Sequence, residues 1–301
     1  MISIITPVFN GEDFIKETVE SVLKFSSGYS AEYIIVDDGS VDSTPNLLRT
    51  FGDLIKLVST ENQGESAAVN LGMKLAKGEV VLIVSADDPL ISSQLFDGVS
   101  ERFRLNQDLV AIYHDWAVIN QNGEILKINR PGPYSDEELI GKFHCLPGPG
   151  TFFRLSSAKL IGGRDPKWRF VADYDFWLRL SRIGKFHYRP EVLAQWRSHP
   201  NSTSVSLRGK EMAEERIGVI KNFLHTNPIH DDLRRAALGS CYLYAAQLCY
   251  FTKLVPGRAY LFQSFLRARK WPKVAKITTV LFILSTPLSR WAVSRVRRIH
   301  K

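Results

Sequence analysis

Residues 33–40 read Tyr-Ile-Ile-Val-Asp-Asp-Gly-Ser and residues 80–88 read Val-Val-Leu-Ile-Val-Ser-Ala-Asp-Asp, so each stretch is an apolar run that leads into two adjacent carboxylates. Short apolar runs rich in β-branched residues predict buried strands. Residues 2–6 and 55–59 have the same character, and segments with helical periodicity separate the four runs. Strands that alternate with helices are typical of a parallel sheet. We therefore predict an α/β domain with a mostly parallel central sheet flanked by helices.

The segments between and after these runs predict further elements. Helices are expected at residues 13–25, 42–51 and 66–76. A hairpin is expected next, because the turn pair Asn122-Gly123 joins the apolar runs 109–119 and 124–128. From residue 207 onward the pattern is helical, with a break at Asn227-Pro228.

The predicted domain boundary follows residue 205. Residues 1–205 form the predicted catalytic domain, with a donor half at 1–120 and an acceptor half at 121–205. The acceptor half is rich in Pro-Gly turns and aromatic residues, a composition typical of a pocket wall built on loops. Residues 206–301 form a predicted all-helical, basic C-terminal extension.

Composition excludes several classes of protein. With 301 residues, 45% of them hydrophobic and 23% charged, the chain is not of the disordered, collagenous or disulfide-stapled type. Cys241 and Cys249 would lie about 12 Å apart along a helix, too far to bridge. The first seven residues lack the basic lead and cleavage site of a signal peptide. We therefore expect a cytoplasmic protein.

Charge is concentrated at the C-terminus. The chain has a net charge of +8, and residues 253–301 hold twelve Lys or Arg and no acid. The apolar stretch 274–288 within this tail is too short to span a bilayer. One interpretation is an amphipathic helix that binds the inner face of an anionic membrane peripherally. The alternative is helical packing on the domain or in a homo-oligomer, and we expect no nucleic-acid partner.

Asp37 and Asp38 end the second predicted strand, where open α/β sheets bind ligands. A carboxylate there can accept hydrogen bonds from a nucleobase or a ribose. The alternative is a turn in which one carboxylate caps the next helix.

Asp87 and Asp88 follow the fourth predicted strand. Paired carboxylates suit Mg²⁺ or Mn²⁺, which complete their shells with phosphate oxygens, so this pair predicts a metal and a diphosphate ligand. The alternative is that they cap a helix near Ser92.

Four ordered motifs resemble the family-two inverting glycosyltransferases with a GT-A fold, which is Rossmann-like. They are Thr-Pro-Val-Phe-Asn at 6–10, Val-Asp-Asp-Gly-Ser at 36–40, Asn-Gln-Gly at 62–64 with Ala68, Asn70 and Gly72, and Ser-Ala-Asp-Asp at 85–88. The resemblance covers about residues 1–205. It implies transfer of a sugar from a nucleotide-diphosphate donor to a hydroxyl of a glycan or lipid-linked acceptor, in cell-surface polysaccharide, O-antigen or lipid-linked glycan synthesis.

The resemblance also implies roles for single residues. Those expected to bind the donor are Thr6, Pro7, Asp37, Asp38, Gly64, Asn70 and Asp87. Asp88, together with Asp87, is expected to hold the Mg²⁺ or Mn²⁺ ion, and His199 stands where a histidine often reaches the metal or the diphosphate.

Asp173 matches the family's general base, at the start of a helix that continues into an aromatic-Trp-Leu-Arg run. It would remove the proton of the acceptor hydroxyl as the sugar configuration inverts. Asp175 is the reserve candidate, and the alternative for Asp173 is a helix cap.

Three positions depart from the family pattern. Ser85 replaces a common first acidic ligand, Glu65 stands where a basic residue is common, and Ala172 replaces an acidic neighbour of the base. The departure at Ser85 keeps open a second function, a non-catalytic sugar-nucleotide or glycan-binding protein. A nucleotidyltransferase is disfavoured, because no Gly-rich phosphate loop with a lysine follows the first strand.

Overall fold

The computed structural model describes residues 1–200, 209–251 and 257–267. The chain divides into two compact units, which we describe separately. The first comprises residues 1–134 and 145–205, and the second comprises residues 135–144 and 206–301. The sequence pattern did not indicate that residues 135–144 group with the C-terminal helices.

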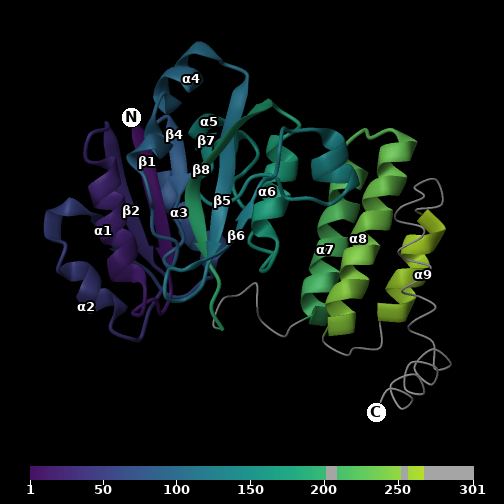
Figure 1. Ribbon diagram of the computed structural model, residues 1–301, viewed down its shortest axis with the longest axis horizontal. Helices are drawn as coiled ribbons and strands as arrows, with labels where there is room; N and C mark the ends of the chain where they lie inside the picture. Colours follow the sequence, from purple (N-terminus) through teal and green to yellow (C-terminus); the bar gives the residue numbers. More distant parts are fainter. Residues whose placement is uncertain (201–208, 252–256, 268–301) are drawn as a thin grey trace. The chain divides into compact units, whose positions relative to one another are not determined.

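Within the described residues, the first unit is built on an eight-stranded sheet in the order β3-β2-β1-β4-β7-β5-β6, with β8 paired to β5 (Figure 1). The strands are β1 Ile2–Val8, β2 Ala31–Asp37, β3 Lys56–Ser59, β4 Val80–Ile83, β5 Leu109–Ile119, β6 Ile125–Asn129, β7 Phe152–Arg154 and β8 Lys185–Arg197. Strands β1 to β4 are mutually parallel, and β8 is parallel to β5. Strand β7 is antiparallel to both β4 and β5, and β6 is antiparallel to β5. The predicted fold class and the predicted hairpin are confirmed.

Helices pack on both faces of this sheet. They are α1 Ile15–Ser26, α2 Thr44–Arg49, α3 Glu65–Leu75, α4 Val99–Leu105, α5 Leu155–Leu160 and α6 Ala172–Leu180. Helix α1 buries Val19 against the face that carries Ile4, whereas α3 buries Val69 against the face that carries Ile5. Because alternate residues of β1 point to opposite faces, the strand is apolar on both sides. This explains why the apolar runs of the sequence are continuous.

Register brings the loops that carry the candidate site residues to one edge of the sheet. Val8 is the register partner of Asp37, which is in turn the partner of Ser59. On the other side of β1, Ile5 pairs with Ile83 at the end of β4. Since these strands are parallel, the loops that follow β1, β2, β3 and β4 all leave from the same edge.

The second unit is helical in its described part. It contains the π-helical turn Glu137–Gly141 and the helices α7 Gly209–Thr226, α8 Asp231–Phe251 and α9 Gly257–Arg267. The predicted break at Asn227-Pro228 separates α7 from α8, where the Asn227 amide donates to the Phe223 carbonyl at 2.9 Å. Cys241 and Cys249 lie on α8 and are not joined by a disulfide, as expected.

The predicted membrane contact involves the basic C-terminal tail, most of which lies outside the described residues. Of the helices that the structure describes, none combines the length and apolarity needed to cross a bilayer. The apolar stretch 274–288 and most of the basic tail lie outside the described residues, so the peripheral membrane contact stays a prediction.

Candidate active site

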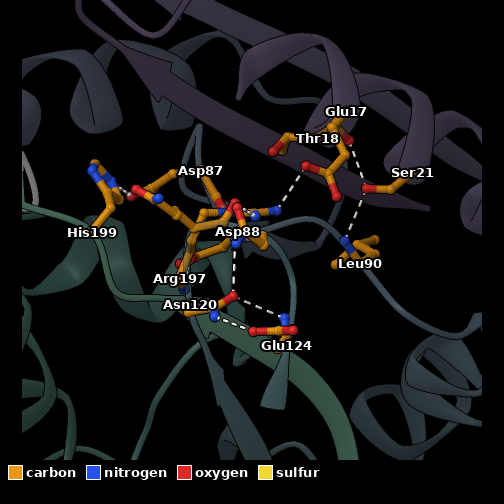
Figure 2. A network of polar contacts seen from close by, with 12 residues as sticks. Glu17, Thr18, Ser21, Asp87, Asp88, Leu90, Asn120, Glu124, Arg197 and His199 are labelled. Carbon is orange, nitrogen blue, oxygen red and sulfur yellow. Dashed lines mark hydrogen bonds and ion pairs between the residues drawn. The ribbon is translucent and has the colours of Figure 1, made fainter. Parts of the chain in front are cut away.

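Asp87 and His199, two of the predicted metal ligands, meet in the structure. Asp87 lies in the loop after β4, and His199 follows the end of β8. The Asp87 Oδ2 and His199 Nε2 atoms are 2.9 Å apart (Figure 2). The side chains are 28% and 12% exposed, respectively. This pair therefore joins a carboxylate and an imidazole at the end of β4.

Asp88, expected to be the leading metal ligand, is used differently. Its Oδ1 accepts the backbone N–H of Arg197 at 2.7 Å, and the Ser85 side chain also hydrogen-bonds to it. Burial raises the pKa of Asp88 well above its usual range, and the negative charge of neighbouring Asp87 makes a smaller contribution in the same direction. The alternative of a helix cap is not observed either, because the turn Ser93–Phe96 is capped by the Ser92 hydroxyl. Asp88 thus ties the β4 loop to the end of β8. Its expected role as a metal ligand stays untested, and the pair that we propose for the metal is Asp87 with His199.

Asp87 and His199 suit a divalent ion that also binds substrate. Among the described residues there is no group of three or more His, Cys, Asp or Glu side chains that could hold a metal. A carboxylate oxygen and an imidazole nitrogen supply two ligands, and Mg²⁺ or Mn²⁺ typically takes its remaining ligands from phosphate oxygens and water. The two residues therefore fit a metal shared with a diphosphate and do not fit a closed structural site.

Asp38 connects two of the sequence motifs. Its Oδ1 accepts the N–H of Gln63 at 2.9 Å, and its Oδ2 accepts the N–H of Gly64 at 2.7 Å. Gly64, at φ +92°, immediately precedes α3. The buried Asp38 carboxylate therefore fixes the Asn-Gln-Gly loop at the edge of the sheet where the loops after β1 to β4 leave.

Asp37 shapes the turn beside it. Its Oδ1 accepts the N–H of Ser40 at 3.0 Å, so for this residue the turn alternative describes the observed contact. Gly39 in the same turn has φ +79°, and an added Cβ would lie 2.9 Å from the backbone nitrogen of Asn62. Only glycine fits this turn without strain.

Thr6 and Pro7 are buried within β1. The Thr6 Oγ1 and the Tyr33 hydroxyl share a hydrogen bond of 2.9 Å in the core. Pro7 is the register partner of Val36 in the middle of the sheet. Both side chains are buried, and the donor contacts expected of them stay predictions.

Asp173 and Asp175, the two candidate bases on α6, have opposite environments. Asp173 is exposed in the first turn, where its Oδ1 accepts the N–H of Tyr174 at 2.7 Å. Asp175 is buried and pairs with Arg179 through contacts of 2.8 and 2.7 Å. Burial raises the pKa of the Asp175 carboxyl, with the Arg179 charge opposing the shift. Of the two, only Asp173 is accessible to a substrate.

Comparison with known proteins identifies the family. The model described as "Glycosyl transferase family 2" matches residues 3–142. An uncharacterised glycosyltransferase of Rickettsia typhi is 31% identical over 210 residues, which is 68% of this chain and 66% of that protein. The chain belongs to glycosyl transferase family 2. The chain spans a smaller share of other relatives, such as 38% of an uncharacterised glycosyltransferase of Rickettsia felis.

Another relative is named for the synthesis of a polysaccharide. Chondroitin synthase of Escherichia coli is 26% identical over 212 residues, which is 68% of this chain and 30% of that protein.

Solved structures share the fold of this family 2 chain. S. aureus TarS 1–349 superposes with a TM-score of 0.62 at 15% identity, covering 91% of this chain and 90% of TarS. The mannosyltransferase PcManGT of Pyrobaculum calidifontis, in complex with GDP-Man and Mn²⁺, has a TM-score of 0.60 at 15% identity, over 97% and 83% of the two chains. At such identities the likeness concerns the fold, and it confirms the GT-A architecture.

Arg164 forms an ion pair with Glu65 at the start of α3. Its Nη1 lies 2.6 Å from the carboxylate of Glu65, the residue that departs from the family 2 pattern. Asn70 holds the main chain of Arg164. Its Oδ1 accepts the Arg164 N–H at 2.9 Å, and its Nδ2 donates to the Arg164 carbonyl at 2.8 Å. The Asn70 amide thus positions Arg164, and the donor contact expected of Asn70 stays a prediction. No local sequence signal marks Arg164, because the contact spans 99 positions.

Proposed function

We propose that this family 2 chain is a metal-dependent, inverting glycosyltransferase that moves a sugar from a nucleotide-diphosphate donor to an acceptor hydroxyl. The pairing of Asp87 with His199 carries the proposal. The pair brings a carboxylate and an imidazole together at the C-terminal end of β4. Asp38 and Gly64 lie in loops that leave the same edge of the sheet. A nucleoside bound along that edge would direct its diphosphate toward the pair.

Each part of the site has a separate task in the proposed reaction. The Asp38-ordered loop, with Gly64 at the start of α3, lines the nucleoside. Asp87 and His199 would hold Mg²⁺ or Mn²⁺, and such an ion neutralises the charge that develops on a departing nucleoside diphosphate. Asp173, exposed on α6, accepts the proton of the acceptor hydroxyl as the oxygen attacks the anomeric carbon. Attack opposite the leaving group inverts the configuration.

Named relatives support the donor class and the biosynthetic setting. TarS has been solved with UDP and with UDP-GlcNAc, and PcManGT with GDP-Man and Mn²⁺. The minor teichoic acid biosynthesis protein GgaA of Bacillus subtilis is 33% identical over 125 residues, which is 38% of this chain and 28% of that protein. We propose a nucleotide-sugar donor and a glycan or lipid-linked acceptor in cell-surface polysaccharide synthesis, with the basic tail contacting an anionic membrane or mediating homo-oligomer formation.

Ser85 is the observation that favours the second candidate, a non-catalytic sugar-nucleotide or glycan-binding protein, because it removes an acidic ligand common in the family. A panel of UDP- and GDP-sugars incubated with Mn²⁺ and followed by NMR separates the two. The proposed enzyme consumes at least one donor and releases the nucleoside diphosphate, and Asp173→Asn lowers this turnover by about 10²-fold or more. A chain that binds a donor but leaves the whole panel intact is a binding protein.

A further inference from the structure

Arg197 is the largest fully buried side chain of the described residues, at 2% exposure. Its guanidinium contacts three separate segments (Figure 2). The Nε donates to the Asp87 carbonyl at 2.9 Å, Nη1 to the Gln121 carbonyl at 2.8 Å, and Nη2 to the Glu17 carboxylate at 2.7 Å. One side chain thus joins the β4 loop, the β5–β6 turn and helix α1.

Arg197 also fixes the β4 loop through its main chain. Its backbone N–H donates to Asp88 Oδ1 at 2.7 Å, while its side chain holds the carbonyl of Asp87. One residue therefore holds both the backbone carbonyl of Asp87 and the side-chain carboxylate of Asp88. The Asp87 carboxylate projects from this clamped segment.

Phe14 links Arg197 to the second member of the metal pair. The Arg197 guanidinium carbon lies 4.8 Å from the centre of the Phe14 ring. The His199 ring centre lies 4.9 Å from the same aromatic ring, inclined at 50°. Since His199 follows Arg197 by two residues, the buried arginine and the shared aromatic contact together fix where the imidazole stands.

We propose that Arg197 is a positioning residue that presets Asp87 and His199 for the divalent ion. The inference rests on the proposed function, because it concerns the metal pair of that site. Arg197 contacts no reacting atom: it acts through the Asp87 main chain, through Asp88 and through Phe14. Lysine cannot replace it, because a single ammonium cannot reach three acceptors that a guanidinium fork reaches at fixed angles.

The test compares Arg197→Lys with Arg189→Lys. Arg189 is a matched control: it is also a buried arginine of β8, but it bonds to the carbonyls of Leu95 and Gln94 and to Glu191. Mn²⁺ binding is measured by electron paramagnetic resonance on the full chain with UDP or GDP present. Residues that orient metal ligands typically contribute about 10–100-fold to metal affinity, and we expect a loss in that range for Arg197→Lys. Arg189→Lys should bind Mn²⁺ as the wild type does.

A kinetic readout separates positioning from general damage to the fold. For Arg197→Lys, the Mn²⁺ concentration that gives half-maximal turnover should rise by about tenfold or more, while turnover at saturating Mn²⁺ recovers toward the wild-type value. Phe14→Leu is the second variant, because it removes the ring shared by Arg197 and His199 and leaves the buried charge paired. Phe14→Leu should also weaken Mn²⁺ binding. It therefore tests the inference even if Arg197→Lys fails to fold.

The outcomes distinguish this inference from the proposed function. Equal Mn²⁺ affinity in the wild type, Arg197→Lys and Phe14→Leu overturns the positioning role and leaves the proposed function intact. An equal loss in Arg197→Lys and Arg189→Lys also overturns it, because the effect would then be one of stability. A wild-type chain that binds no Mn²⁺ with either nucleotide contradicts the metal pair itself.

Discussion

The Asp87 carboxylate and the His199 imidazole lie 2.9 Å apart although 112 positions separate them in the chain. Their strands, β4 and β8, are not neighbours in the sheet. The link between them is the bond from the Arg197 backbone to Asp88, which draws the end of β8 onto the β4 loop. A carboxylate that bonds to the end of β8 thus stands directly beside the carboxylate of the proposed metal pair.

Asp87→Asn and Asp88→Asn should therefore fail in different ways. Asp87→Asn should weaken Mn²⁺-dependent nucleotide binding by about tenfold or more and change the free energy of unfolding by less than about 0.5 kcal/mol. Asp88→Asn should lower the free energy of unfolding by about 1–3 kcal/mol, because it disturbs buried hydrogen bonds. Calorimetry and urea unfolding measure the two effects. Loss of metal binding in Asp88→Asn alone, with unchanged stability, would contradict the assignment.

Asp173→Asn should lower turnover by about 10²-fold or more and leave donor affinity unchanged, because only the proton acceptor is lost. Asp175→Asn is the matched control on the same helix. It breaks the pair with Arg179, which is partly exposed, so we expect a loss of about 1–3 kcal/mol in unfolding free energy and a smaller effect on turnover. The reverse order of kinetic effects would move the base to Asp175.

The sheet and its first helices could be predicted because their signals are local. Each strand and helix expected between residues 2 and 128 is present, with ends shifted by two residues or fewer. The same signals predicted that the candidate residues lie at one edge of the sheet, because the loops after parallel strands all leave from the same side.

The functions of individual carboxylates could not be predicted in the same way. Asp87 and Asp88 are identical in type and adjacent, and they differ in tertiary contacts: Asp88 accepts the N–H of Arg197, 109 positions away, whereas Asp87 pairs with His199. Thr6 belongs to a family motif, yet the Tyr33 hydroxyl occupies its side chain. Such choices depend on tertiary contacts that leave no periodicity in the sequence.

Thr6→Val tests the structural role of that motif threonine. The substitution leaves the buried Tyr33 hydroxyl without its partner, so the free energy of unfolding should fall by about 1–3 kcal/mol while donor affinity stays unchanged. The double variant Thr6→Val/Tyr33→Phe removes both partners and should recover much of the loss. A large fall in donor affinity at unchanged stability would return Thr6 to the nucleotide site.

The basic tail should bind anionic vesicles at low salt. Each basic residue near such a surface contributes about 1 kcal/mol, and salt screens the attraction. Replacement of Arg295, Arg297 and Arg298 by glutamine should reduce co-sedimentation with phosphatidylserine vesicles and spare donor binding. Neutral phosphatidylcholine vesicles are the control. Equal sedimentation with both lipids, or none at low salt, would exclude an electrostatic membrane contact.

The most direct test of the metal pair is calorimetric titration of UDP and GDP into the wild-type chain, once with Mn²⁺ and once with EDTA. If Asp87 and His199 hold an ion that the diphosphate shares, at least one nucleotide should bind about tenfold or more tightly with Mn²⁺. The gain should disappear in Asp87→Asn. A nucleotide that binds the wild type with the same affinity in Mn²⁺ and in EDTA would contradict the proposed site.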